Sequence, residues 1–197
     1  MKSLLVALLI TLGLMSSVSA QEHSSRPPKL PPNTSTPANP ATTPNTANSV
    51  GWTKFTSDEG RFSVVMPGTP EDKVETKPSD HGPYTTHLFI LRNQEHVFLI
   101  GYVDYDPSFN FNLQAELEMN RDNFIKGLGV TLLTTRSLKI DGYSVIEFTA
   151  EGPQKIFTSR VYMVGRRPYQ IVIGSPKGVD DSVNINRFFN SFKVSLN

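Results

Sequence analysis

From residue 52 onward, apolar and polar residues repeat with the two-residue period of β-strands, and short turn signals separate the runs. Phe62, Val64 and Met66, for example, share one face of such a run. The segment 97–105 is apolar on both faces, which predicts a strand that is covered on both sides. Strands are predicted over 52–56, 61–66, 73–76, 84–91, 97–105, 130–140, 143–150, 155–164 and 169–174.

Two segments change to the period of a helix. In the first, four apolar residues fall on one helical face: Leu113, Leu117, Phe124 and Leu128. Asn112 suits the N-cap of this helix, and Gly127 and Gly129 suit its end. The second helix is predicted over 180–192, where four apolar residues share a face: Ile185, Phe188, Phe189 and Phe192. Asp180 and Asp181 suit its N-terminus, and Lys193 suits its C-terminal end.

The short connections between successive strands predict antiparallel pairing. Asp141 and Gly142 form the strongest hairpin signal in the chain, and Arg166, Arg167 and Pro168 predict a second hairpin tip. The order is strands, helix, hairpins, helix. We therefore expect an α+β domain with two main helices on an antiparallel sheet of about seven to nine strands.

The first 20 residues have the pattern of a secretory signal peptide. Lys2 supplies the positive charge, 4–15 is apolar, and Ala20 ends a run of small residues before the expected cut. The apolar run is shorter than the roughly 20 residues that span a bilayer. We expect cleavage after Ala20, a secreted or periplasmic protein, and no transmembrane span after cleavage.

Residues 21–50 contain seven prolines and few large apolar side chains. Such a segment buries too little surface to offset its chain entropy, so we expect a disordered tether. It is either a solubilising tail or a spacer that reaches a partner, and the sequence leaves both open. A single domain is expected over 51–197.

Particular residues of this domain resemble a known family. Trp52 and Phe55, the run EGRFSVVMPGTP at 59–70, and the run FFNSF at 188–192 are similar to the ends of small exported bacterial domains with a PsbP-like fold. The resemblance implies an α/β/α sandwich around an antiparallel sheet. It also implies a noncatalytic role, since such domains are mostly accessory subunits of membrane assemblies, envelope lipoproteins and adaptors.

Composition and charge exclude several classes of function. The formal net charge is +1, and it falls to zero when Lys2 is removed. This balance argues against a nucleic-acid-binding protein, which would carry a basic excess. The chain has no Cys, which excludes disulfides, thiol catalysis, thiolate metal sites and a lipid-modified cysteine anchor.

No catalytic motif is present. The four histidines include no metal-binding HExxH pair, and Gly142 begins a run that lacks the second glycine of a nucleophile elbow. We therefore expect no enzyme activity, no catalytic residue and no cofactor.

A weak metal signal lies between the fifth strand and the first helix. Oxygen-bearing side chains alternate there, as in calcium loops: Asp104, Asp106, Ser108 and Asn110. Phe109 and Ala115, however, stand where an EF-hand needs Gly and Glu. We therefore expect a polar turn here and not a calcium site.

Four other residues are candidates for binding a partner or ligand. Phe109 and Phe111 either form an exposed apolar anchor or fold into the core beneath the helix. Arg166 and Arg167 at the hairpin tip suit a phosphate or a carboxylate.

Together these features predict an exported, noncatalytic accessory module that binds an envelope or membrane-associated protein. The alternative is a carrier of a small molecule or lipid, with a cavity between sheet and helix. A hydrolase whose site is assembled only in space is a third hypothesis.

Overall fold

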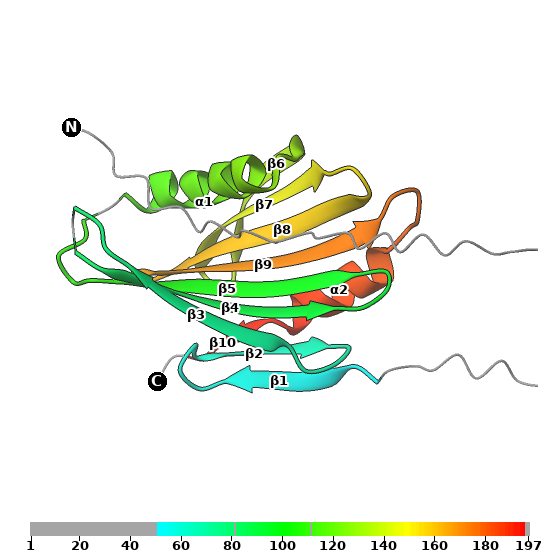
Figure 1. Ribbon diagram of the computed structural model, residues 1–197, viewed down its shortest axis with the longest axis horizontal. Coiled ribbons are helices and arrows are strands. Elements are labelled where there is room, and N and C mark those ends of the chain that lie inside the picture. The colour runs from blue at the N-terminus through cyan, green and yellow to red at the C-terminus, as the bar shows by residue number, and fades with distance from the viewer. Residues whose placement is uncertain (1–50, 81, 111, 196–197) are drawn as a thin grey trace, which may run out of the picture. The chain divides into compact units, whose positions relative to one another are not determined.

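The computed structural model describes residues 51–80, 82–110 and 112–195, so the expected signal peptide and tether lie outside the described residues. In the described part, ten strands form two antiparallel sheets, and two helices pack on the larger sheet (Figure 1). This confirms the expected α+β class. No helix in these described ranges is long and apolar enough to cross a bilayer.

The larger sheet has seven strands, in the order β3-β4-β5-β9-β8-β7-β6. Their bounds are β3 (Glu71–Lys77), β4 (Tyr84–Arg92), β5 (Val97–Tyr105), β6 (Thr131–Ile140), β7 (Tyr143–Glu151), β8 (Lys155–Val164) and β9 (Arg167–Pro176). Two meanders, β3–β5 and β6–β9, are joined by the antiparallel pair β5–β9. This pair places β5 and β9 at the centre of the sheet, where both faces are covered.

A separate sheet of three strands was not predicted. It contains β1 (Thr53–Ser57), β2 (Phe62–Met66) and β10 (Lys193–Val194), in the order β1-β2-β10. The Val65 N–H donates to Ser191 Oγ at 2.9 Å, so the end of α2 is also bonded to β2. The last described residues are thereby held against the first strands.

The first helix, α1 (Leu113–Leu128), begins and ends as the sequence predicts. The Asn112 side chain accepts hydrogen bonds from two backbone N–H groups, and Gly129 adopts a left-handed φ of 61° at the C-cap. One expectation was wrong: Leu113 is 50% exposed, whereas Leu117 and Phe124 are buried against the sheet. Leu113 lies in the first turn, at the end of the apolar face that the sheet does not cover.

The second helix, α2 (Ser182–Ser191), is shorter than the predicted 180–192. Asp181 is its N-cap residue, and Lys193 belongs to β10 and not to the last helical turn. The predicted β8–β9 tip is also shifted, because Val164 pairs with Arg167 and the turn consists of Gly165 and Arg166. Arg167 and Pro168 are therefore strand residues.

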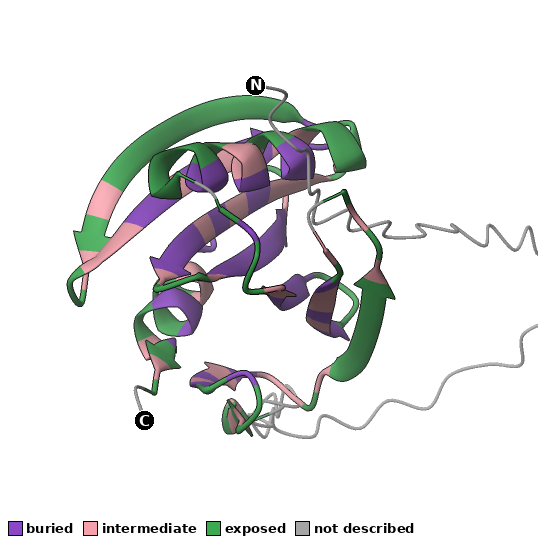
Figure 2. Cartoon of the chain, turned by 90° about the vertical axis from the view of Figure 1, so that its left-hand side faces the viewer, coloured by how far each residue is buried: buried purple, intermediate pink, exposed green. Residues whose placement is uncertain are grey.

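Each face of the seven-stranded sheet has its own core, seen as the purple residues of Figure 2. Helix α1 packs on β7, β8 and β9, where the core is largely aliphatic. Helix α2 and the three-stranded sheet cover the other face, where Phe, Tyr and one stacked His ring dominate. Phe62 of β2 lies at the centre of this second core, with no exposed surface.

Candidate functional site

The two predicted partner-binding or metal-binding segments meet at one end of the sheet. Arg166 Nη2 donates to three backbone carbonyls of the loop after β5: Asp106 O and Pro107 O at 3.3 Å, and Phe109 O at 2.5 Å. Arg167 Nε donates to Asp104 Oδ1 at 2.6 Å. The β8–β9 hairpin therefore holds the loop through both arginines.

The loop itself forms a compact polar turn. Asp106 Oδ1 accepts from the N–H of Ser108 at 2.9 Å and from its hydroxyl at 2.7 Å. Hydrogen bonds from Ser108 lower the pKa of Asp106. Asn110 is exposed. Among the described residues, no group of three or more His, Asp or Glu has the arrangement of a metal site.

The two candidate aromatic residues have different outcomes. Phe109 is 6% exposed, and its ring lies 4.9 Å from that of Tyr105. It therefore takes the inward of the two alternatives that the sequence left open. Phe111 lies outside the described residues.

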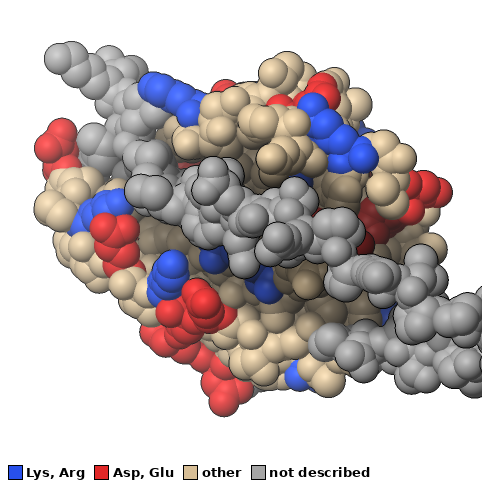
Figure 3. Space-filling view, turned by 45° about the vertical axis from the view of Figure 1, so that its right-hand side comes forward, with Lys and Arg blue, Asp and Glu red and all other residues tan. Residues whose placement is uncertain are grey.

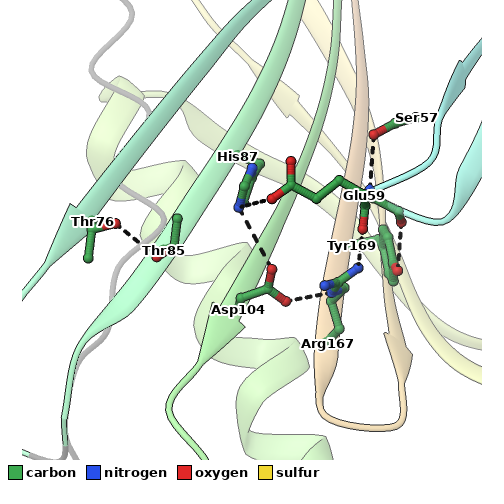
Figure 4. A network of polar contacts seen from close by, with 9 residues as sticks. Ser57, Glu59, Thr76, Thr85, His87, Asp104, Arg167 and Tyr169 are labelled. Atoms are coloured by element: carbon green, nitrogen blue, oxygen red, sulfur yellow. Dashed lines mark hydrogen bonds and ion pairs between the residues drawn. The ribbon is translucent and has the colours of Figure 1, made fainter.

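Beside Arg167 lies a histidine network that sequence reasoning did not single out. His87 is 4% exposed, and its Nε2 lies 3.9 Å from Glu59 Oε1 and 3.7 Å from Asp104 Oδ2 (Figure 4). Both distances exceed a hydrogen bond. His87 and Asp104 come from adjacent strands, whereas Glu59 comes from the β1–β2 turn.

Tyr102 is the centre of this network. Its ring stacks on His87 at 4.3 Å, and the Arg167 guanidinium lies 4.7 Å from its centroid. The Tyr102 hydroxyl is buried, with no hydrogen-bond partner among the described residues. Burial, followed by the nearby Glu59 carboxylate, raises the pKa of Tyr102. The phenol is therefore neutral over the physiological range.

The contacts of this network hold the β1–β2 turn on the large sheet. Arg167 Nη1 donates to Glu59 O at 3.0 Å, and the Tyr169 hydroxyl donates to Gly60 O at 2.9 Å. Among the described residues, the polar contacts of the His87 imidazole are with the carboxylates of Glu59 and Asp104 and include no Ser, Thr or Cys. The described contacts of His87 therefore do not include the Ser–His or Cys–His pair of covalent catalysis.

A second buried histidine lies at the start of α2. Asp181 Oδ2 accepts from Ser175 Oγ and lies 3.0 Å from His96 Nε2. Asn184 Nδ2 donates to the other carboxylate oxygen at 2.6 Å. The residue types match those of a serine hydrolase, but the order differs, because the serine bonds to the aspartate and not to the histidine. His96 therefore has no hydroxyl to activate.

Glu116, in the first turn of α1, is another buried polar residue. Its carboxyl accepts from the Tyr105 hydroxyl and from Asn120 Nδ2, the latter at 3.1 Å. Burial raises the pKa of Glu116, against the opposing effect of these two hydrogen bonds. Glu116 is 4% exposed, so its carboxyl is shielded from solvent.

Three of the surface hollows lined by described residues have volumes of about 210, 320 and 200 Å³. The one of about 320 Å³ lies between the start of α1 and the β6–β7 hairpin, near Gln114 and Ser137. Ligand pockets usually have about 300 to 1,000 Å³. Two of these hollows are smaller than this range and the third lies at its lower limit, and none of the three is lined by His87, His96 or Glu116.

Acidic and basic side chains lie among one another on the face drawn in Figure 3. A polyanion would meet carboxylates as well as cations there.

Comparison with solved structures identifies the fold. The cyanobacterial PsbP protein (CyanoP) of Synechocystis sp. PCC 6803 is similar to this chain with a TM-score of 0.50 and 7% sequence identity, over 77% of this chain and 97% of that one. The domain has the PsbP-like fold. This agrees with the resemblance of 59–70 and 188–192, whose residues form β2 and the end of α2.

A crystal structure of a protein from Bacteroides thetaiotaomicron VPI-5482 is also similar, with a TM-score of 0.39 and 15% identity, over 73% of this chain and 48% of that one. No protein-family model matches the chain, and no curated protein sequence matches it.

Proposed function

We propose that this PsbP-like domain is the noncatalytic binding module of an exported protein, and that it assists a protein assembly of the cell envelope or a membrane. One observation carries the proposal. The buried side chains with chemical capability are engaged in contacts that hold the fold: His87 with its aromatic and acidic neighbours, His96 and Ser175 with Asp181, and Glu116 with Tyr105. We therefore expect the outer surface of the domain to bind the partner.

The packing also favours protein binding over the carrier alternative. Both faces of the seven-stranded sheet are filled by side chains, and residues such as Phe62, Phe148 and Ile171 have no exposed surface. A carrier would need an apolar cavity at one of these interfaces. The signal-like pattern at 1–20 and the proline-rich segment at 21–50 support an exported module on a tether.

The proposal is tested by affinity purification from the native host. Residues 21–197 and the tether alone, 21–50, would carry the same tag, and both eluates would be analysed by native mass spectrometry. We expect a protein partner to co-purify with 21–197 and not with 21–50. A stoichiometric small-molecule adduct without a protein partner would favour the carrier instead.

Activity is tested separately with ester, phosphate and peptide substrates. We expect rates no higher than those of buffer. Turnover by the wild type that His87→Asn or Ser175→Ala abolishes would overturn the noncatalytic assignment.

A further inference from the structure

The outer edge of the seven-stranded sheet at β6 is exposed along most of its length, and only Leu138 and Ile140 are partly buried against the aromatic core. Helix α1 packs mainly on β7, β8 and β9, and α2 packs on β2 and β9. Helix α1 also contacts β6 through Arg121, whose Nη1 donates to Thr135 Oγ1 at 3.3 Å. In Figure 2, β6 is the long, mostly green strand beyond α1. Leu132 and Leu133 are 37% and 49% exposed. Among the described residues, β6 pairs with β7 alone.

The hairpin geometry shows which backbone groups point outward. Asp141 and Gly142 have φ values of 51° and 85°, as a two-residue type I′ turn requires, and Ile140 pairs with Tyr143. In such a turn the closing residues Ile140 and Tyr143 form a hydrogen-bonded pair. Hydrogen-bonded pairs occur at every second position of an antiparallel ladder, so the even-numbered residues of 134–140 direct their N–H and C=O toward β7. Thr135, Ser137 and Lys139 therefore direct theirs outward.

The opposite edge of the sheet is protected in the way that edge strands usually are. In its seven residues, β3 carries five charged side chains: Glu71, Asp72, Lys73, Glu75 and Lys77. Charges on an edge strand discourage the addition of another strand. In its ten residues, β6 carries only Arg136 and Lys139, and it has no proline. Its one irregularity is a bulge at Leu133, between the pairs of Leu132 and Thr134.

The charge on this edge points to an acidic occupant. Arg136 Nε donates to Glu147 Oε1 at 2.7 Å, but Arg160 Nε occupies Oε2 of the same carboxylate at 2.7 Å. Two guanidinium groups thus share one negative charge. Lys139 has no ion pair with any described residue, and β6 contains no acidic residue. The edge therefore has an excess of positive charge.

Resting on the function proposed above, we infer that β6 receives an extended acidic segment of the partner protein by strand addition. The outward groups of Thr135, Ser137 and Lys139 bond to its backbone. Its carboxylates lie opposite Arg136 and Lys139, three positions apart and on opposite faces of the strand. A second copy of the chain would bring two more cations to this edge. The segment 21–50 is excluded as the added strand by its seven prolines.

The test uses residues 21–197 and a labelled ten-residue peptide of alternating valine and threonine, with two glutamates three positions apart. A second peptide carries lysines in place of the glutamates. We expect the glutamate peptide to bind about tenfold more tightly in fluorescence anisotropy. It should also slow hydrogen exchange at the amides of Thr135, Ser137 and Lys139.

Two variants locate the binding. Ser137→Pro removes one outward N–H and should abolish binding, while Lys139→Glu should weaken binding of the glutamate peptide. Lys73→Glu makes the same charge change on the opposite edge and should have no effect. Lys139→Glu is a surface change, so it keeps the test valid if Ser137→Pro does not fold.

Equal affinity for both peptides, protection at β3 instead of β6, or a β6-protected dimer without peptide would each overturn the inference. The purification from the native host distinguishes failure of the strand-addition inference from failure of the proposed function. If the Ser137→Pro chain captures the same partner as the wild type, the module binds through another surface. If neither chain captures a partner, the proposed function fails as well.

Discussion

The two faces of the seven-stranded sheet each bury a carboxyl at the start of a helix, but the two carboxyls have different partners. Glu116 in α1 is bonded to the neutral side chains of Tyr105 and Asn120. Asp181 at the N-cap of α2 is bonded to Ser175 and Asn184 and faces the His96 ring. Both residues are at least nine-tenths buried. The same position, a buried carboxyl at the start of a helix, is therefore satisfied on one face by a phenol and an amide and on the other by a hydroxyl, an amide and an imidazole.

The packing of the two faces differs as well. On the α2 face, the ring of Phe62 contacts five others, including those of Phe89 at 5.5 Å and Phe192 at 5.7 Å. On the α1 face, aliphatic side chains dominate, and Leu117 is a central member. We expect the aromatic face to lose more stability when a central residue is truncated.

The largest effect should come from Phe62→Ala. We expect a loss of about 4 kcal/mol in the free energy of unfolding, and about 3 kcal/mol for Leu117→Ala on the other face. The aromatic side chain leaves the larger cavity. Urea denaturation of both variants measures the difference, and an equal or smaller loss at Phe62 would remove the distinction between the faces.

Asp181→Ala should follow, with a loss of about 2 to 3 kcal/mol, because it leaves the buried Ser175 hydroxyl and the partly buried Asn184 amide without their acceptor. Thermal unfolding measures this loss. Asp180→Ala is the matched control, since that neighbouring carboxylate is exposed and bonds only to Ser182 among the described contacts. If the two variants are equally stable, Asp181 does not organise the start of α2.

Glu116→Gln should change the pH dependence of stability. Because burial raises the pKa of Glu116 above its ordinary 4.5, the contribution of this group is full below that value. It is lost as pH rises through the folded-state pKa. We expect the Gln variant to gain stability relative to the wild type as the pH rises above about 4.5, by less than Asp181→Ala loses. Denaturation at several pH values checks this, with the exposed Glu118→Gln as control. A constant difference across pH would contradict the direction of the shift.

The smallest effects concern two neighbouring tyrosines of the aromatic face. Tyr102→Phe removes a buried hydroxyl without a partner among the described residues, so stability should stay the same or rise by up to about 1 kcal/mol. Tyr169→Phe removes the hydrogen bond to Gly60 O and should cost about 1 kcal/mol. Chemical denaturation compares the pair. A larger loss at Tyr102 would show that its hydroxyl does have a partner in solution.

The parts of the fold that the sequence predicts are those with local causes. The Asn112 cap, the Gly129 stop and the Asp141–Gly142 turn each act within a few residues, and the structure has all three. The split into two sheets has a distant cause. Strand β10 has two residues, and its pairing with β2 joins positions about 130 apart, such as Ser63 and Lys193. A strand of two residues is too short to show the alternation of apolar and polar residues that predicts a strand.

The histidine network was missed for the same reason. His87 and Asp104 approach each other only through the β4–β5 register, in which Thr85 and not His87 pairs with Asp104. Glu59 arrives from a turn of another sheet. The sequence does predict that Arg166 and Arg167 lie near a hairpin tip. The contacts of Arg166 with the 106–109 loop, however, depend on the pairing of β5 with β9, which the spacing of residues along the chain does not show.

The pairing of β10 with β2 also sets an order in time. The aromatic face cannot close until residues 188–194 are available, because Phe188, Phe189 and Phe192 complete it and Ser191 bonds to β2. A chain that is synthesised from its N-terminus therefore carries Phe62 without its covering helix until residues 188–194 have appeared. During that interval the half-built domain is a substrate for chaperones. A chain that is truncated before residue 188 should therefore be degraded and not persist as a shorter protein.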